Sequence, residues 1–156
     1  MELDGLPLHP LIVHAVVVFA PLTGVAGLVY AAVPRWRWWL RWPLVIAAVL
    51  AAGAAVLAAS SGKDLAEARG LDVLPAVHTH EEAGELLRNV LLGNVVVVAL
   101  AAWLLGGRTA LASGRGARDS RGALSWVVAG LLATASVMVL YAAFRAGDTG
   151  ARAVWG

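Results

Sequence analysis

The chain has 156 residues, of which 60% are apolar, only 14% are charged and none is cysteine, and its mean hydropathy is +0.78. Because soluble domains carry about 25% charged residues, this composition excludes a soluble enzyme and a disordered tail. The absence of cysteine excludes a disulfide framework, thiolate catalysis and cysteine-ligated iron–sulfur clusters. The sequence therefore predicts a small integral membrane protein.

Four apolar segments are each long enough to cross a hydrocarbon core, which takes about 20 helical residues. They span residues 11–33, 42–60, 80–105 and 123–144. The first has no basic residue before it, so we expect a retained span and not a cleaved signal peptide. The sequence predicts an all-α, four-helix transmembrane bundle that forms a single domain over residues 1–156.

Charge is distributed unevenly between the segments that connect the spans. Seven of the twelve basic residues lie between spans one and two or between spans three and four: Arg35, Arg37, Arg41, Arg108, Arg115, Arg118 and Arg121. Nine of the ten acidic residues lie on the other side. The positive-inside rule then places both termini on the outer side, and we expect a multi-pass protein of the bacterial cytoplasmic membrane.

Two further patterns indicate helices in lipid. Four tryptophans beside the first arginine group fit an interfacial aromatic belt better than nucleic-acid stacking, so no nucleic-acid partner is expected: Trp36, Trp38, Trp39 and Trp42. Small residues at four-residue spacing in the second span predict close helix packing: Ala47, Ala51, Ala55 and Ala59.

All four histidines fall on the side that we expect to be outer, near the starts of spans one and three: His9, His14, His78 and His80. Pro10 as the first helical residue would make His9 the N-cap and put His14 about one turn inside. An imidazole at that depth needs a partner, a cavity or a ligand. Two readings stay open, a bound metal or haem and simple hydrogen bonding to loops. The candidate metal ligands are the four histidines and Glu81.

The third span begins with polar residues that predict a network of side chains. Glu81, Glu85 and Arg88 share one helix face, so Arg88 is expected to pair with one of the two carboxylates. Asn94 lies deep enough to need a partner on another helix. The alternative is that the acidic residues only stabilise the start of the helix.

The stretch Gly5-Leu-Pro-Leu-His-Pro-Leu-Ile-Val-His14 resembles the opening of a bacterial membrane-protein family known as domain of unknown function 2231. The similarity extends to a His and a Gly near the start of span three, here His80 and Gly84. It also extends to a C-terminal pattern matched by the run from Gly147 to Gly156, although Asp148 stands where relatives often have His. The resemblance covers essentially the whole chain and implies the same four-span fold.

Three functions are compatible with the sequence. The first is b-type haem for electron transfer, with His14 and His80 as axial ligands from two facing helices. The second is a Zn or Cu site built from the histidines, with Glu81 or Asp148. The third is a non-catalytic accessory subunit that contacts a redox or membrane-complex protein, and a homodimer is compatible with each. The sequence offers no catalytic residues and leaves enzymatic activity open.

Overall fold

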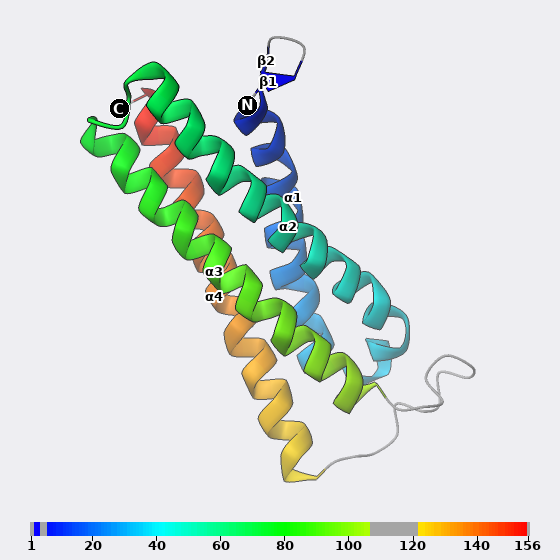
Figure 1. Cartoon of the computed structure of the whole chain (residues 1–156). Helices are drawn as coiled ribbons and strands as arrows, with labels where there is room; N and C mark the ends of the chain where they lie inside the picture. Colours follow the sequence, from blue (N-terminus) through cyan, green and yellow to red (C-terminus); the bar gives the residue numbers. More distant parts are fainter. Residues whose placement is uncertain (1, 4–5, 107–121, 156) are drawn as a thin grey trace.

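The computed structural model describes residues 2–3, 6–106 and 122–155, and shows a bundle of four long helices (Figure 1). In chain order the elements are β1 (Glu2–Leu3), β2 (Leu6–Pro7), α1 (Leu8–Ala32), the 3-10 turn η1 (Pro34–Trp36), α2 (Arg37–Arg69), α3 (Pro75–Leu105) and α4 (Ala123–Trp155). The two short strands pair antiparallel, with Glu2 opposite Pro7 and Leu3 opposite Leu6.

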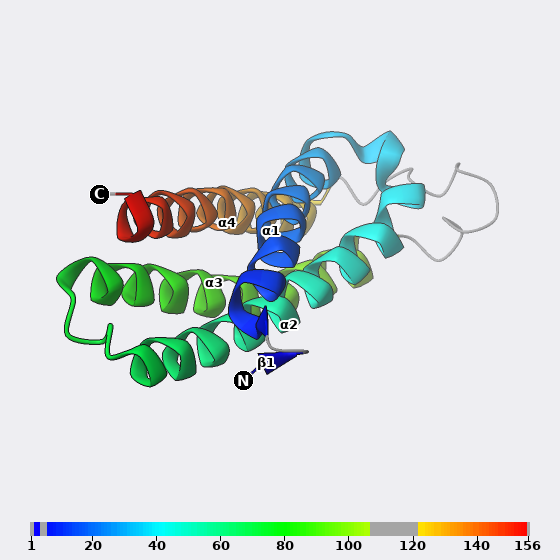
Figure 2. The ribbon, with the colours of Figure 1, turned by 90° about the horizontal axis from the view of Figure 1, so that it is seen from above.

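The helices are arranged so that each packs on two neighbours: α1 on α2, α2 on α3, α3 on α4, and α4 on α1. Both ends of the described chain lie at one end of the bundle, the upper end in Figure 1, and Figure 2 shows the bundle from above. We call this upper end the terminal end, and the opposite end, with Arg35, Arg37 and Arg41, the arginine end. All four helices are long and apolar enough to cross a membrane, which confirms the predicted fold class.

Three of the helices are longer than the spans that they contain. Helices α2 and α4 have 33 residues each, or about 50 Å at 1.5 Å per residue, against a hydrocarbon core of about 30 Å. Helix α2 continues past Ser60 to Arg69 and ends at Gly70, whose φ of 62° only glycine adopts freely. Pro75 then starts α3 as its first helical residue. Most of the additional length of these three helices therefore lies at the terminal end of the bundle.

The interior consists of two apolar clusters, one nearer each end of the bundle. The small-residue stripe contributes Ala51 and Ala55 to the cluster nearer the terminal end. Ala47 is also buried, and Ala59 lines a pocket described below. The predicted packing role of the stripe is thus confirmed for its first three members. The four belt tryptophans are 42–49% exposed, as expected for side chains that face lipid.

Two arginines donate hydrogen bonds to the C-terminal carbonyls of helices at the arginine end. Arg37 donates hydrogen bonds from Nε to the Tyr30 carbonyl at 2.8 Å and from Nη2 to the Ala31 carbonyl at 2.9 Å. Arg41 donates to the Gly106 carbonyl, beyond the end of α3, at 3.2 Å. The last carbonyls of a helix lack intrahelical partners and carry partial negative charge. These residues therefore satisfy the C-terminal ends of α1 and α3. The predicted arginines at 108, 115, 118 and 121 lie outside the described residues.

Replacing Arg37 by Leu should destabilise the bundle, because two carbonyls would lose charge-assisted hydrogen bonds. Such bonds contribute about 1.5–3 kcal/mol each, and solvent at the half-buried site lowers this, so we expect a loss of about 1–3 kcal/mol. Thermal unfolding in detergent measures it. Arg35→Leu is the matched control, since Arg35 is exposed and only stacks on Trp36. Equal melting temperatures for the two variants would contradict the capping role.

Candidate functional site

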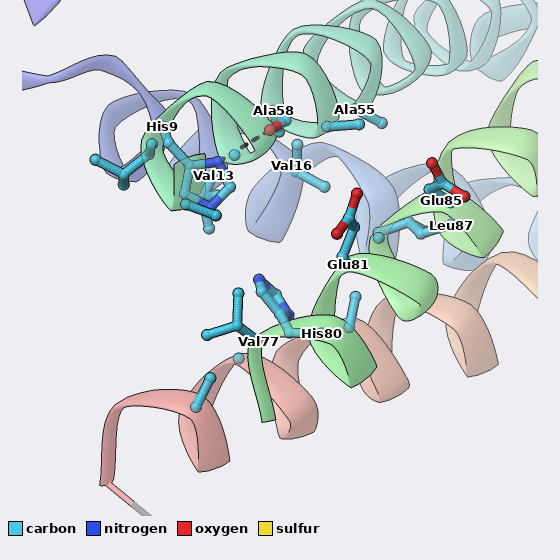
Figure 3. A pocket seen from close by; sticks show the side chains of 18 of the residues that line it. His9, Val13, Val16, Ala55, Ala58, Val77, His80, Glu81, Glu85 and Leu87 are labelled. Carbon is cyan, nitrogen blue, oxygen red and sulfur yellow. Dashed lines mark hydrogen bonds between the residues drawn. The ribbon is translucent and has the colours of Figure 1, made fainter. Parts of the chain in front are cut away.

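The terminal end of the bundle contains an open cavity of about 310 Å³ to which all four helices contribute. Its walls are mostly Ala, Gly, Val and Leu. The polar side chains in its lining are His9, Lys63, His80, Glu81 and Glu85. Figure 3 shows His9 and His80 reaching into the cavity from facing sides, with Glu81 and Glu85 along one wall. A mostly apolar pocket with a few convergent polar groups is typical of a ligand site.

His9 reaches the cavity from the first turn of α1, because that helix begins at Leu8 and not at Pro10. Its Nδ1 lies 2.9 Å from the Ala58 carbonyl of α2. A carbonyl only accepts, so Nδ1 carries the proton and Nε2 keeps its lone pair. The ring lies against Gly62, where a Cβ would come within 3.0 Å of the imidazole Cε1. Helix α2 therefore provides both the acceptor and the space for His9.

His80 lies on α3, and α4 provides a hydrogen-bond acceptor and a glycine for it, as α2 does for His9. Its Nδ1 is 3.3 Å from the Thr149 hydroxyl, which itself lies 2.9 Å from the Arg145 carbonyl. Because the hydroxyl proton goes to that carbonyl, the hydroxyl oxygen accepts from Nδ1, and Nε2 of His80 keeps its lone pair. A Cβ at Gly150 would lie 2.9 Å from the His80 Cε1. The second imidazole is thus held by an acceptor and a glycine of its neighbouring helix.

The two imidazoles are close together across the diagonal of the bundle. Their ring centres are 6.4 Å apart and their planes make an angle of 74°. Each has its Nδ1 engaged with a neighbouring helix, which is the arrangement that orients a metal-ligating histidine and leaves Nε2 available. The pair can therefore accept one electrophilic atom between the two rings.

A cluster of three charged residues forms another part of the wall. Lys63 Nζ is 2.7 Å from Glu85 Oε1 and 3.2 Å from Glu81 Oε1. Lys63 thus makes the ion pairs with these two carboxylates, and Arg88 Nε donates to the Asn89 side chain at 3.2 Å. The pairing of Arg88 with a carboxylate stays a prediction. Lys63 reaches the two carboxylates because of the length of α2. The sequence interpretation ended that span at Ser60, whereas the helix continues and carries Lys63 to the face of α3.

The other two histidines are not among the residues that line the cavity. His14 is exposed, and its Nδ1 is 2.6 Å from the Pro10 carbonyl of its own helix. His78 is exposed and lies 3.5 Å from Glu82. Within the part of the chain that the structure describes, no three His, Asp or Glu side chains gather as a metal-ligand group. A ligand role for His14, His78 or Glu81 stays a prediction.

Four residues of this site were not identified by the sequence analysis: Gly62, Lys63, Thr149 and Gly150. Gly150 was noted only as part of a terminal pattern, and Thr149 lay beyond the end of the predicted fourth span at residue 144. Helical periodicity gives a signal, because Ala143, Ala146 and Gly150 follow one another at three- and four-residue spacing and all line the cavity. Extending that small-residue face past residue 144 would have pointed to the glycine.

Gly150→Ala should displace the His80 ring while leaving the bundle folded. The added Cβ would lie 2.9 Å from Cε1, so the imidazole must rotate and lengthen its contact with Thr149. Gly147→Ala is the matched control, because Gly147 lines the same cavity and its Cβ would meet nothing within 4 Å. The measurement is the ¹⁵N chemical shift of the His80 ring nitrogens. An unchanged shift in Gly150→Ala, or an equal change in the control, would contradict the contact.

Comparison with known proteins gives a family and nothing more specific. No curated protein and no solved structure matches this chain. One family model does match, over residues 5–156, and its description is predicted membrane protein, DUF2231. The segments that carry the resemblance converge on the cavity, since His9, His80, Gly84, Gly147 and Gly150 all line it. The chain therefore belongs to the DUF2231 family of predicted membrane proteins.

Proposed function

We propose that this protein binds haem b at the terminal end of the bundle, with His9 and His80 as the axial ligands, and serves in electron transfer. The observation that carries the proposal is the separation of 6.4 Å between the two imidazole centres, contributed by diagonally opposite helices. His9 takes the place that the sequence analysis gave to His14, because His9 lines the cavity and His14 is exposed.

The separation of the two ring centres is within the range that bonds from both imidazoles to one metal atom would allow. Two metal–nitrogen bonds of about 2.0–2.1 Å, with about 1 Å from each nitrogen to its ring centre, place the centres roughly 6 Å apart when the three atoms are collinear. A tetrahedral angle at the metal brings the same centres about 1 Å closer together. The value of 6.4 Å is close to the first of these distances, so His9 and His80 would be able to hold the iron of a b-type haem between them. Rotation about the metal–nitrogen bonds is free, so the angle of 74° between the ring planes is compatible with it.

The lining supports a flat apolar ligand. The small residues of the walls leave room beside the two rings, above all on α2 and α4: Ala58, Ala59, Gly62, Ala143, Ala146 and Gly147. Lys63 provides a cation that could turn from its carboxylate partners towards the acidic groups of such a ligand. The cavity lies at the edge of the membrane core, because about 20 residues counted from Trp42 along α2 end near residue 61 and the α2 residues that line the cavity run from Ala55 to Ala66. A soluble redox partner can therefore approach it closely.

The direct test is expression in haem-supplemented cells, followed by purification in detergent and measurement of the absorption spectrum and the metal content. We expect a Soret band and about one iron per chain, with the haem extractable as protohaem. Protein that folds and carries no haem would overturn the proposal. Stoichiometric Zn or Cu in place of iron would support the metal-site alternative, and a metal-free protein that copurifies with a stable partner would support the accessory-subunit alternative.

We also propose that the terminal end faces the outer side of the cytoplasmic membrane, because the arginine end carries the excess of basic residues. A single cysteine at Thr79, which is exposed at the terminal end, should react in intact spheroplasts with a membrane-impermeant maleimide. A cysteine at Ser113 should react only after the cells are lysed. The reverse pattern would place both termini and the histidine pair in the cytoplasm.

A further inference from the structure

A layer of buried polar groups lies near the middle of the bundle, between the two apolar clusters. Thr23 of α1, Asn94 of α3 and Ser136 of α4 are each no more than 1% exposed. Each falls in its helix between a residue of one cluster and a residue of the other: between Ala20 and Tyr30, Leu91 and Val98, and Leu132 and Val139. Buried residues at one level of a four-helix bundle face a shared core, so we treat these three as one layer.

None of the polar atoms in this layer has a hydrogen-bond partner among the described residues. They are Thr23 Oγ1, Ser136 Oγ and both amide atoms of Asn94. In hydrocarbon, an unsatisfied polar group costs several kcal/mol. Other hydroxyls of the same bundle avoid this cost: Ser60, Ser61, Thr79 and Thr149 each donate to a carbonyl three or four residues back. Thr23 and Ser136 do not use that default partner.

The neighbouring helix explains the position of the serine hydroxyl. A Cβ at Gly27 would lie 2.2 Å from Ser136 Oγ, so the serine side chain occupies space that only a glycine on α1 leaves free. Thr23 is one turn from Gly27 on the same helix. The Ser136 hydroxyl therefore lies at the contact between α1 and α4, one helical turn along α1 from Thr23. The Asn94 amide has two donors and one acceptor.

We propose that this layer is a closed hydration site, in which one or two water molecules bridge Thr23, Asn94 and Ser136. A buried water makes about three hydrogen bonds to groups that are otherwise unsatisfied, which matches three polar side chains. The layer contains no charged side chain among the described residues, so it offers nothing to offset the desolvation of an ion. The apolar clusters above and below close it at both ends, so it is an enclosed site and not a pore.

Thermal unfolding of isosteric variants tests this. If water bridges the three groups, Thr23→Val or Ser136→Ala removes one hydrogen bond from that water and weakens its bonds to the other two side chains. Each variant should then lower Tm by about 3 °C or more. Thr23→Ser, which keeps the hydroxyl, should retain wild-type Tm. The triple variant with Asn94→Leu should fall by less than the sum of the single changes. Thr79→Val is the control, because Thr79 is exposed and bonds only to the Pro75 carbonyl.

The opposite results are equally clear. If the single variants leave Tm unchanged or raise it, and the triple variant changes Tm by the sum of the single changes, no water bridges the three side chains. That result would overturn the proposal. Should the variants fail to fold, a high-resolution structure of the wild-type protein in lipid gives the same decision. Density for water within hydrogen-bond distance of Asn94 supports the site, and direct bonds among the three side chains contradict it.

Discussion

His9→Ala and His80→Ala are each expected to lower the haem bound per chain at least tenfold, while His14→Ala leaves it unchanged. His9 and His80 are the imidazoles whose ring centres are 6.4 Å apart, and each substitution removes one of the two proposed bonds to the iron. His14 is exposed and bonded to the carbonyl of Pro10 in its own helix. Absorbance at the Soret band per chain, measured after size-exclusion chromatography, gives the result.

A further variant separates ligation from a structural role. Adding free imidazole to His80→Gly should restore haem binding, because the added ring can occupy the space left beside Thr149 and Gly150. A merely structural histidine would not be replaced in this way. If His14→Ala loses the haem and His9→Ala keeps it, the pair that the sequence first suggested is the ligand set, and the assignment to His9 is wrong.

Ala51→Leu is expected to produce a large loss of stability. Ala51 has no exposed surface and belongs to the cluster that also contains Val16 and Leu91. Three added carbons at a close helix contact force the helices apart, and overpacking typically costs about 1–3 kcal/mol and occasionally more. We expect Tm to fall by about 3–10 °C for a chain of this size.

The control for this change lies two residues further along the same helix. Gly53 is exposed, and a Cβ there would meet nothing within 4 Å, so Gly53→Leu adds a larger side chain towards lipid. We expect an unchanged or higher Tm, since the glycine is also the poorer helix former. A loss of stability in Gly53→Leu comparable to that in Ala51→Leu would show that α2 packs through a different face.

The sequence predicted the fold well because its strongest signals are local. Apolar run length indicates membrane spans, and the alanine stripe identified a helix face that is in fact buried at Ala51. The ends of the helices were predicted less well, since α2 and α4 continue into polar sequence that looks like loop. Lys63 and Thr149 lie in those continuations, which is why their contacts with Glu85 and His80 could not be anticipated.

The histidine pair could be predicted only in part. The grouping of the four histidines on one side and the depth of His80 followed from spacing alone. Whether His9 or His14 faces His80 depends on where α1 begins and on how it crosses α2. A helix start at Leu8 puts His9 in the first turn, where the Ala58 carbonyl engages it. Such a contact between residues 49 positions apart leaves no periodic trace in the sequence.

The most direct test of the account is the low-temperature EPR spectrum of the ferric, haem-loaded protein. Two imidazoles on one iron give a strong ligand field, so we predict a low-spin signal for the wild-type protein and for His14→Ala. His9→Ala, with one axial ligand removed, should give a high-spin signal in whatever haem it retains. A high-spin wild-type protein, or a low-spin signal that survives in His9→Ala and is lost in His14→Ala, would contradict the assignment of His9 and His80.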